Sequence, residues 1–169
     1  PDYYSMSVLS TLLGGGMSSR LFQEVREKRG LVYSIYSFAS CFEDGGIFGI
    51  YAGTGKDEVG ELLPIICFEL QKLADKIDDD EVARARSQLK AATLMALEST
   101  TSRSEQVARQ LQIFGRIVPV EEVINQIEKV SVSALKRTTK RLLRSELTIA
   151  AIGQIQNVEE FSAIKKRLN

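Results

Sequence analysis

The sequence predicts an α+β domain in which helices pack on one face of a mainly antiparallel sheet. Two observations lead to this prediction: helical and strand patterns do not alternate, and two of the strands form a hairpin. Helical and strand patterns do not alternate along the 169 residues: two helical patterns come first, then a β-hairpin, then five helical patterns, one strand and a final helix. Doubly wound parallel sheets need alternation, whereas hairpins build antiparallel sheets whose helices gather on one face. We therefore expect one α+β domain over residues 1–169 rather than a doubly wound sheet.

The composition excludes several classes of protein and of site. The chain is 44% hydrophobic and 26% charged, which is ordinary for a globular domain and unlike a disordered chain. The chain has 22 Lys and Arg residues and 22 Asp and Glu residues, so it has no net charge that would favour nucleic acid. No apolar run approaches the ~20 residues of a membrane span. The absence of histidine excludes a Ser-His-Asp triad, a Cys-His pair and a histidine-ligated zinc site within this chain. We expect no nucleic-acid partner and no membrane span.

The first two helical patterns end at glycines. An apolar pattern over residues 6–13 predicts a helix that ends at Gly14–Gly16, where we expect left-handed backbone. Ser18 or Ser19 can cap a second helix, which is predicted to stop at Gly30. Both segments are therefore expected to be helical up to these stops.

A β-hairpin follows. Residues 31–41 and 47–52 are rich in β-branched and aromatic side chains, and an Asp-Gly pair lies between them. This pattern is typical of two strands joined by a tight turn. Cys41 and Cys67 both lie in apolar stretches without a Cys-x-x-Cys spacing, so we expect two buried free thiols rather than a disulfide.

Capping signals mark the starts of the later helices. Asp78 with Glu81 forms a near capping box, and Ser102 with Glu105 forms a second one for a helix that ends at Gly115. The other predicted elements are a long helix from residue 57, helices at 120–128 and 133–144, a buried strand at 147–152 and a terminal helix from 157. Three strands make a thin sheet for so many helices, so we expect a further strand that preceded the first residue and has been cut away.

Three charged or glycine-rich motifs have simple structural explanations. Glycines before a helix can bind phosphate, but Gly14–Gly16 lacks the lysine of a Walker motif, so a helix-to-helix turn is favoured. The acidic run 78–81 suits the positive end of a helix dipole better than a metal site. One predicted helix has a basic side without interleaved aromatics, which indicates a solvated face rather than a nucleic-acid site: Lys136, Arg137, Lys140, Arg141 and Arg144.

One helix-to-strand junction could bring two hydrogen-bond donors together. Arg26 falls at the shoulder of the apolar stripe of its helix, and Tyr33 follows seven residues later near the start of a strand. A tight turn between them can aim a guanidinium and a phenol at one place, where both would suit a peptide carbonyl that gains negative charge. The simpler alternative, which pattern alone favours, is a solvated Arg26 and a core Tyr33 with a hydrogen-bonded hydroxyl.

The run GGGMSSRLFQEVREKRGLVYSIYSF, residues 14–38, closely resembles the C-terminal half of the zinc peptidases related to mitochondrial processing peptidase and pitrilysin. The resemblance extends more loosely over the whole chain. Members of this family have two similar α+β halves. The resemblance implies that the N-terminal half carries an inverted zinc motif, H-x-x-E-H, and that the C-terminal half lacks zinc ligands and closes over the peptide. Residues 1–169 would be that C-terminal, non-zinc half.

The resemblance also implies site residues, cofactor and partners. Arg26 and Tyr33 match the Arg and Tyr that reach the substrate near the scissile bond, so we expect them to bind the peptide and to stabilise the transition state. We expect no metal in this chain, zinc in the absent N-terminal half, and no activity from the fragment alone. The expected partners are a zinc-bearing half or partner subunit and a peptide substrate, in bacteria or in mitochondria. Two alternatives are a non-catalytic scaffold or partner subunit of the same fold and, more distantly, an unrelated α+β domain that binds a small molecule.

Overall fold

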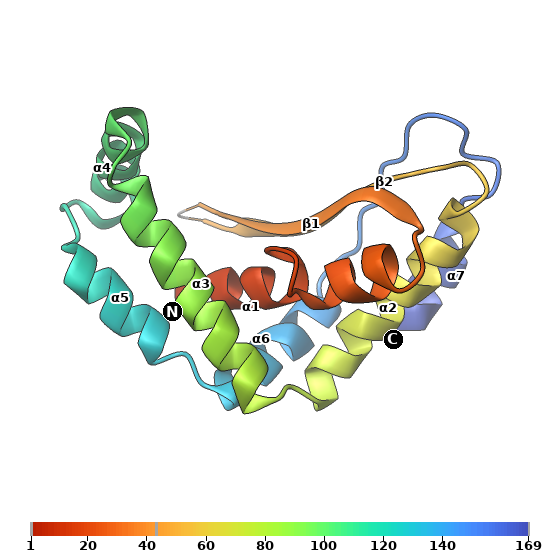
Figure 1. Cartoon of the computed structure of the whole chain (residues 1–169), viewed down its shortest axis with the longest axis horizontal. Coiled ribbons are helices and arrows are strands. Elements are labelled where there is room, and N and C mark those ends of the chain that lie inside the picture. The colour runs from red at the N-terminus through yellow and green to blue at the C-terminus, as the bar shows by residue number, and fades with distance from the viewer. Residues whose placement is uncertain (1, 43, 169) are drawn as a thin grey trace.

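A computed structural model describes residues 2–42 and 44–168 and shows an α+β structure (Figure 1). Helix α1 (Tyr3–Gly14) and a short π-helix, η1 (Phe22–Glu27), precede the sheet. Strands β1 (Val32–Cys41) and β2 (Gly46–Thr54) form a hairpin. The later helices are α2 (Val59–Asp75), α3 (Asp79–Ala96), α4 (Thr100–Phe114), α5 (Val120–Glu128), α6 (Val132–Leu143) and α7 (Phe161–Leu168). The predicted α+β class is confirmed, because a hairpin supplies the sheet and the helices form a separate layer.

The sheet is an antiparallel pair with one covered face. Its register runs from Val32 opposite Thr54 to Cys41 opposite Gly46. Ser37 is buried toward α1, while Tyr36 beside it is exposed on the other face, as the alternation of a strand requires. In Figure 1 the hairpin lies along one side of α1, and the other helices lie on the same side as α1 or beyond the ends of the hairpin.

Helix α1 forms the centre of the core. Val8, Leu9 and Leu13 have no exposed surface, and the helix packs against β1, α3 and α6. A hydrogen bond joins the sheet to α1: the hydroxyl of Ser37 in β1 donates to the carbonyl of Ser10 at 2.7 Å. The hairpin is thus held against the most buried helix of the molecule.

The glycines that end α1 are needed for space and not for left-handed backbone. Gly15 has φ −83°, so the expected positive φ at Gly14–Gly16 is wrong. A Cβ on Gly14 would lie 2.5 Å from the backbone nitrogen of Ser37, which only glycine avoids. The predicted stops at Gly30 and Gly115 are confirmed, since both have φ +65°.

Two predicted helix starts are displaced along the chain. Helix α4 is capped by Ser99, whose hydroxyl accepts a hydrogen bond from the backbone N–H of Ser102 at 3.3 Å, so the predicted cap lies inside the helix. Helix α7 begins at Phe161 and not at Asn157. The amide of Asn157 donates instead to the carbonyl of Lys56 at 2.9 Å, a distant contact that keeps this residue outside the helix.

The predicted strand at 147–152 is wrong. The segment belongs to no helix or sheet, and within the described residues β1 and β2 are the only paired strands. Ile149 is half-buried and Ile152 is fully exposed. A strand forms where a neighbour takes up its N–H and C=O groups, and in the described part of the chain this segment forms no backbone hydrogen bond with another.

Candidate functional site

Arg26 and Tyr33 lie at the two ends of the connection between η1 and β1. Gly30 donates its N–H to the carbonyl of Arg26, and Leu31 donates to the carbonyl of Val25, each at 3.0 Å. The left-handed backbone of Gly30 lets the chain reverse at this point. Backbone hydrogen bonds therefore fix the end of the helix against the start of the strand.

Element η1 is a π-helix and not the α-helix that the sequence predicts. The N–H of Lys28 donates to the carbonyl of Gln23, five residues earlier, at 3.0 Å. Val25 is fully buried and anchors the turn, whereas Arg26 after it is exposed. A π-turn is rare, adds one residue to a helical turn and is frequently found at functional sites. This departure from α geometry coincides with the predicted site residue Arg26.

The guanidinium of Arg26 has no carboxylate partner within residues 2–42 and 44–168. Its carbon lies 4.9 Å from the ring centroid of Phe22, which supports it from one side. The nearby carboxylate of Glu24 is already used by Arg29 at 2.8 Å and Lys28 at 2.5 Å. Hydrogen bonds from Arg29 and then Lys28 lower the pKa of Glu24. The N–H groups of Arg26 therefore remain available to an external acceptor.

Tyr33 is the extra residue of a β-bulge. The register of the hairpin shifts between Val32 and Ser34, which leaves Tyr33 unpaired. Its side chain is 80% exposed, and no hydrogen bond to its hydroxyl occurs in the described part of the chain. The simpler alternative expected a core Tyr33, and this part of it is wrong. It also expected a solvated Arg26, and Arg26 is exposed to solvent. The structure places both donors on one connection without a hydrogen bond between them.

An uncharged face of the hairpin begins beside Tyr33. Tyr36 and Tyr51 stack across the strands with ring centroids 5.0 Å apart, and the ring of Phe38 covers Gly49. No charged residue is among the outward positions, which are Ser34, Tyr36, Phe38, Ser40, Ile47, Gly49, Tyr51 and Gly53. Such a face suits a peptide backbone and apolar side chains better than a charged ligand.

Arg20, which the sequence does not predict as important, ties the start of η1 to two helices. Its Nε and Nη2 donate to both carboxylate oxygens of Glu81 at 2.8 and 2.7 Å, and Nη2 also donates to the carbonyl of Lys76 at 2.8 Å. Its Nη1 lies 3.9 Å from the carboxylate of Glu69. The side chains of Arg20 and Glu69 are only 9% and 3% exposed. This buried cluster holds η1 against α2 and α3.

The electrostatics of the cluster follow from its burial. Burial alone would raise the pKa of Glu81, but hydrogen bonds from Arg20 and from the backbone of Asp78 outweigh it, so the pKa is lowered. That backbone bond also confirms the capping box predicted for α3. The sequence signal for the cluster is Glu69, a carboxylate on the apolar stripe of α2, because a buried charge needs a partner.

The residues of this chain do not fit a zinc site. Within residues 2–42 and 44–168 no group of three or more His, Cys, Asp or Glu side chains could hold a metal ion, and the sequence contains no histidine. The two cysteines are free thiols: Cys67 is buried, with its pKa raised by burial, whereas Cys41 is half-buried. In the described part of the chain no helix is both long and apolar enough to cross a bilayer.

Residues 1–89 match the family described as the Peptidase M16 inactive domain, which is more than half of the sequence. The chain belongs to this family. The matched residues include α1, η1, the hairpin and α2, so Arg26 and Tyr33 both lie within them. The resemblance to zinc peptidases seen in residues 14–38 is thereby confirmed.

Several relatives of the M16 domain are named as peptidases. The chain is 39% identical over 155 residues to an uncharacterized zinc protease of Streptomyces coelicolor, covering 91% of this chain and 34% of that protein. It is 35% identical over 156 residues to the uncharacterized zinc protease YmxG of Bacillus subtilis, covering 92% and 38%. It is 33% identical over 177 residues to a probable mitochondrial-processing peptidase subunit beta of Arabidopsis thaliana, covering 99% and 33%. The chain spans about a third of the length of these relatives.

Solved structures share the fold. A protease from Helicobacter pylori superposes with a TM-score of 0.74 at 26% identity, covering 83% of this chain and 34% of that one. A chain of Complex III2 from Candida albicans superposes with a TM-score of 0.90 at 23% identity, covering 99% and 43%. At 23% identity, the likeness to the Complex III2 chain shows a shared fold alone.

Proposed function

We propose that this chain is the substrate-binding and chamber-closing half of a zinc-dependent endopeptidase, in which Arg26 and Tyr33 contact the peptide near the scissile bond. One observation carries the proposal. Both side chains are exposed, neither has a hydrogen-bond acceptor among the described residues, and both belong to one connection fixed by its backbone. The relatives named as zinc proteases support the class of reaction.

The two donors would act on the peptide carbonyl whose oxygen gains negative charge during hydrolysis. A guanidinium and a phenol both donate hydrogen bonds, and a guanidinium also carries positive charge. Donors that are held in place before the reaction need little reorganisation when charge develops. The contact with the Phe22 ring restricts the guanidinium of Arg26, and the bulge sets the point at which Tyr33 leaves the strand. Loss of one such donor typically costs ~3 kcal/mol of transition-state stabilisation, which is about 100-fold in rate.

The peptide would lie extended beside the hairpin, partly as an added strand. Extended peptides gain affinity by pairing their backbone with the edge of a sheet, and specificity by placing alternate side chains on its face. The uncharged face that begins beside Tyr33 supports this arrangement, because it offers aromatic rings and small residues and no competing charge. Side chains of the peptide would pack on Tyr36 and Tyr51.

The zinc ion would belong to an N-terminal half or to a partner subunit. The residues of this chain do not fit the metal, so its own contribution is to bind the peptide and to supply donors. We expect the chain alone to be inactive. In the curated relatives, about two thirds of the length lies outside the matched part, which is enough for a second half of similar size.

The test assembles the chain with a zinc-bearing half and compares two variants that each remove one hydroxyl. Tyr33→Phe is expected to lower kcat about 100-fold with an unchanged zinc content. Tyr3→Phe is the matched control, because it removes the hydroxyl of another exposed tyrosine, which lies on α1 outside the proposed peptide site, and its kcat is expected to stay near wild type. Wild-type turnover of Tyr33→Phe would refute the role of this residue.

A second variant tests the charge of Arg26, and the assembled wild-type complex separates the enzyme from the alternative of a non-catalytic partner subunit. Arg26→Gln keeps hydrogen-bonding capacity but removes the charge, so we expect kcat to fall while peptide binding persists. If the assembled wild-type complex binds peptide but never cleaves it, the chain acts through protein–protein contact alone and the peptidase proposal is wrong.

A further inference from the structure

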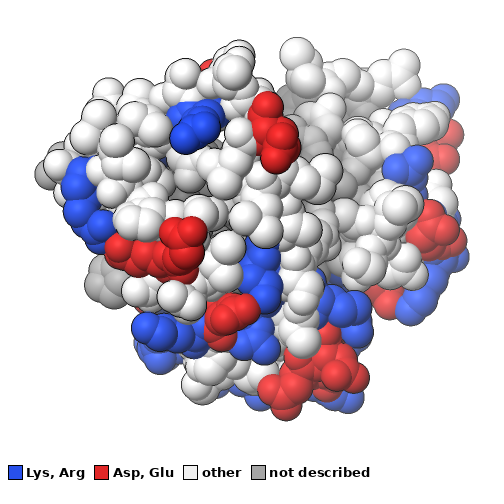
Figure 2. Space-filling view, turned by 60° about the vertical axis from the view of Figure 1, so that its left-hand side comes forward, with Lys and Arg blue, Asp and Glu red and all other residues white. Residues whose placement is uncertain are grey.

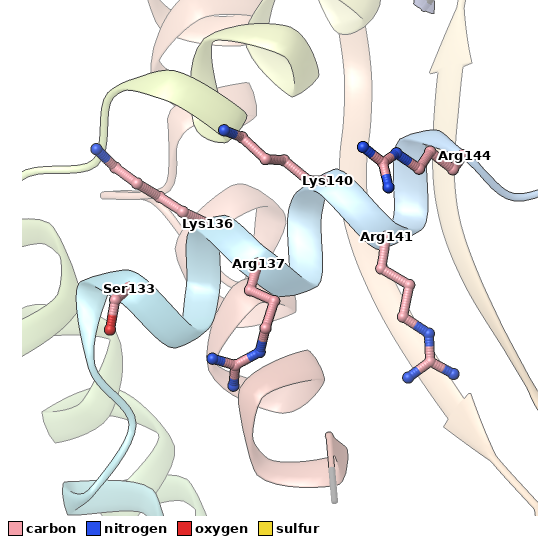
Figure 3. Close-up of a pocket in the computed structure, with 6 residues that line it drawn as sticks. All are labelled: Ser133, Lys136, Arg137, Lys140, Arg141 and Arg144. Carbon is pink, nitrogen blue, oxygen red and sulfur yellow. The ribbon is translucent and has the colours of Figure 1, made fainter.

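A concentration of positive charge lies on α6, a different element from the proposed peptide site. Five of the 22 cationic residues fall within residues 136–144, and α6 itself contains no Asp or Glu. We call them the basic face of α6: Lys136, Arg137, Lys140, Arg141 and Arg144 (Figure 3). Elsewhere the two signs are mixed, as Figure 2 shows for another side of the molecule.

All five cations project from one side of the helix. With about 100° between successive residues, they fall within an arc of about 140°. The opposite side is buried against α1 and α2 and includes Leu135, Thr138 and Thr139. The basic face is thus the whole solvent side of α6 and not a scatter of surface charges.

The cations form two rows with a hollow between them. Lys136 and Lys140 extend to one side of the helix axis, and Arg137 and Arg141 extend to the other (Figure 3). Residues four apart in a helix are separated by about 6 Å along its axis. The hollow has a volume of about 540 Å³ and is lined by the five cations, chiefly by their aliphatic stems, and by the small side chain of Ser133.

Four of the five charges have no partner in the described part of the chain. Only Arg141 forms an ion pair, with Asp2 at 2.5 Å. Like charges four residues apart destabilise a helix, and this helix contains such pairs in both rows. The negative end of the helix dipole accounts for cations in the last turn, but Lys136 and Arg137 lie before it. An external acidic group would relieve the repulsion that remains.

We propose that the basic face of α6 docks an acidic segment of a partner protein, whose carboxylates lie about one helical turn apart and flank an apolar side chain that enters the hollow. Charge complementarity fixes the sign of the partner. The aliphatic walls of the hollow fit an apolar side chain of a protein. The pair between Arg141 and Asp2 is an example of the same contact within the chain. This proposal is independent of the peptidase site.

Two other anionic partners fit the basic face less well. Base-specific recognition of nucleic acid uses stacking and hydrogen bonds to bases, and the residues around the hollow include no aromatic or amide side chain. The chain also has no net charge to attract a polyanion from a distance. A membrane surface needs large apolar side chains beside the cations, and α6 exposes none.

The test measures binding of the 169-residue chain to a labelled helical peptide with Glu at every fourth position and Leu between. Fluorescence anisotropy is expected to show binding whose Kd rises at least about tenfold between ~0.05 and ~0.5 M salt, since exposed charges are screened. Lys136→Glu with Lys140→Glu is expected to weaken binding at least about tenfold. Arg103→Glu with Lys129→Glu is the matched control: both are exposed and form no ion pair in the described part of the chain, and binding should change less than about twofold.

Charge reversal of the peptide keeps the test decisive if the first variant is altered in structure. A peptide with Lys in place of Glu should bind the Lys136→Glu, Lys140→Glu variant more tightly than it binds the wild type. The proposal is overturned by absence of binding at ~1 mM peptide, or by equal losses in the variant and its control. Binding of duplex DNA or of anionic lipid vesicles as tight as that of the peptide also overturns it, because the face would then be a general anion surface.

Discussion

Replacing Arg20 by methionine tests how firmly the segment that contains Arg26 is anchored. The change removes three hydrogen bonds, two to Glu81 and one to the carbonyl of Lys76. It also leaves the carboxylate of Glu69, which is 3% exposed, without the guanidinium that now lies 3.9 Å away. Methionine fills much of the space of the arginine stem, so the loss of charge pairing dominates the effect.

The magnitude follows from the burial of the charge left behind. Removing one member of a buried ion pair costs about 3–5 kcal/mol, because the remaining charge stays out of water. Lys72 lies 3.4 Å from the other oxygen of Glu69 and compensates in part. We therefore expect Arg20→Met to lower the free energy of unfolding by about 3 kcal/mol, the low end of this range. Adding Glu69→Gln should recover part of the loss, because it removes the stranded charge.

The assay is urea denaturation followed by circular dichroism, with Arg116→Met as the control. Arg116 donates two hydrogen bonds to the carboxylate of Glu122 at 2.9 and 2.6 Å, the same bidentate geometry, but both side chains are exposed. Exposed pairs contribute little to stability, so the control is expected to unfold almost like the wild type. Equal losses for Arg20→Met and Arg116→Met would show that burial does not decide the strength of this pair, and the reasoning would be wrong.

Three further measurements test other parts of the structure. Gly14→Ala should lower the free energy of unfolding by about 1–3 kcal/mol, because the added Cβ would lie 2.5 Å from the backbone of β1. Gly16→Ala should be nearly neutral, because its Cβ would meet only the end of a glutamine side chain. Equal losses of stability in urea denaturation would contradict this reasoning. The lowered pKa of Glu81 contributes stability that is present above its unfolded pKa of about 4.3 and is lost as the pH falls through its folded pKa, so Glu81→Gln should flatten the acid loss of stability measured by denaturation at several pH values. Iodoacetamide should modify Cys41 faster than Cys67, which is buried and has a raised pKa, and mass spectrometry showing the reverse order would contradict the assigned burial.

Elements specified by neighbouring residues were predictable from the sequence. The alternation of side chains and the Asp-Gly pair fix the hairpin, which the structure confirms as β1 and β2. The capping box is likewise specified by two residues three positions apart, Asp78 and Glu81, and the stop at Gly30 is specified by one glycine. The candidate residues Arg26 and Tyr33 were named from the resemblance of residues 14–38 to a family motif, and their role stays a prediction.

Features that depend on distant contacts were not predictable in this way. The segment at 147–152 has the composition of a strand, but pairing requires a neighbour, and composition does not supply one. The spacing of apolar residues in η1 fits an α-helix, and the extra residue of the π-turn leaves no mark on that spacing. The anchoring role of Arg20 depends on α2 and α3, some 50 to 60 residues further along the chain.

Because η1 contains a π-turn, the direction of the Arg26 side chain depends on the number of residues in this segment. Such a turn holds one residue more than the α-turn that could take its place. Deleting a single residue from Phe22–Glu27 would let the segment close with ordinary α spacing, so the side chains inside the turn would be redistributed around its axis while the chain beyond the turn keeps its register. A guanidinium that now points outward would then be replaced by a neighbour of different chemistry. A single-residue deletion here would consequently change the direction of the donor without any substitution at position 26.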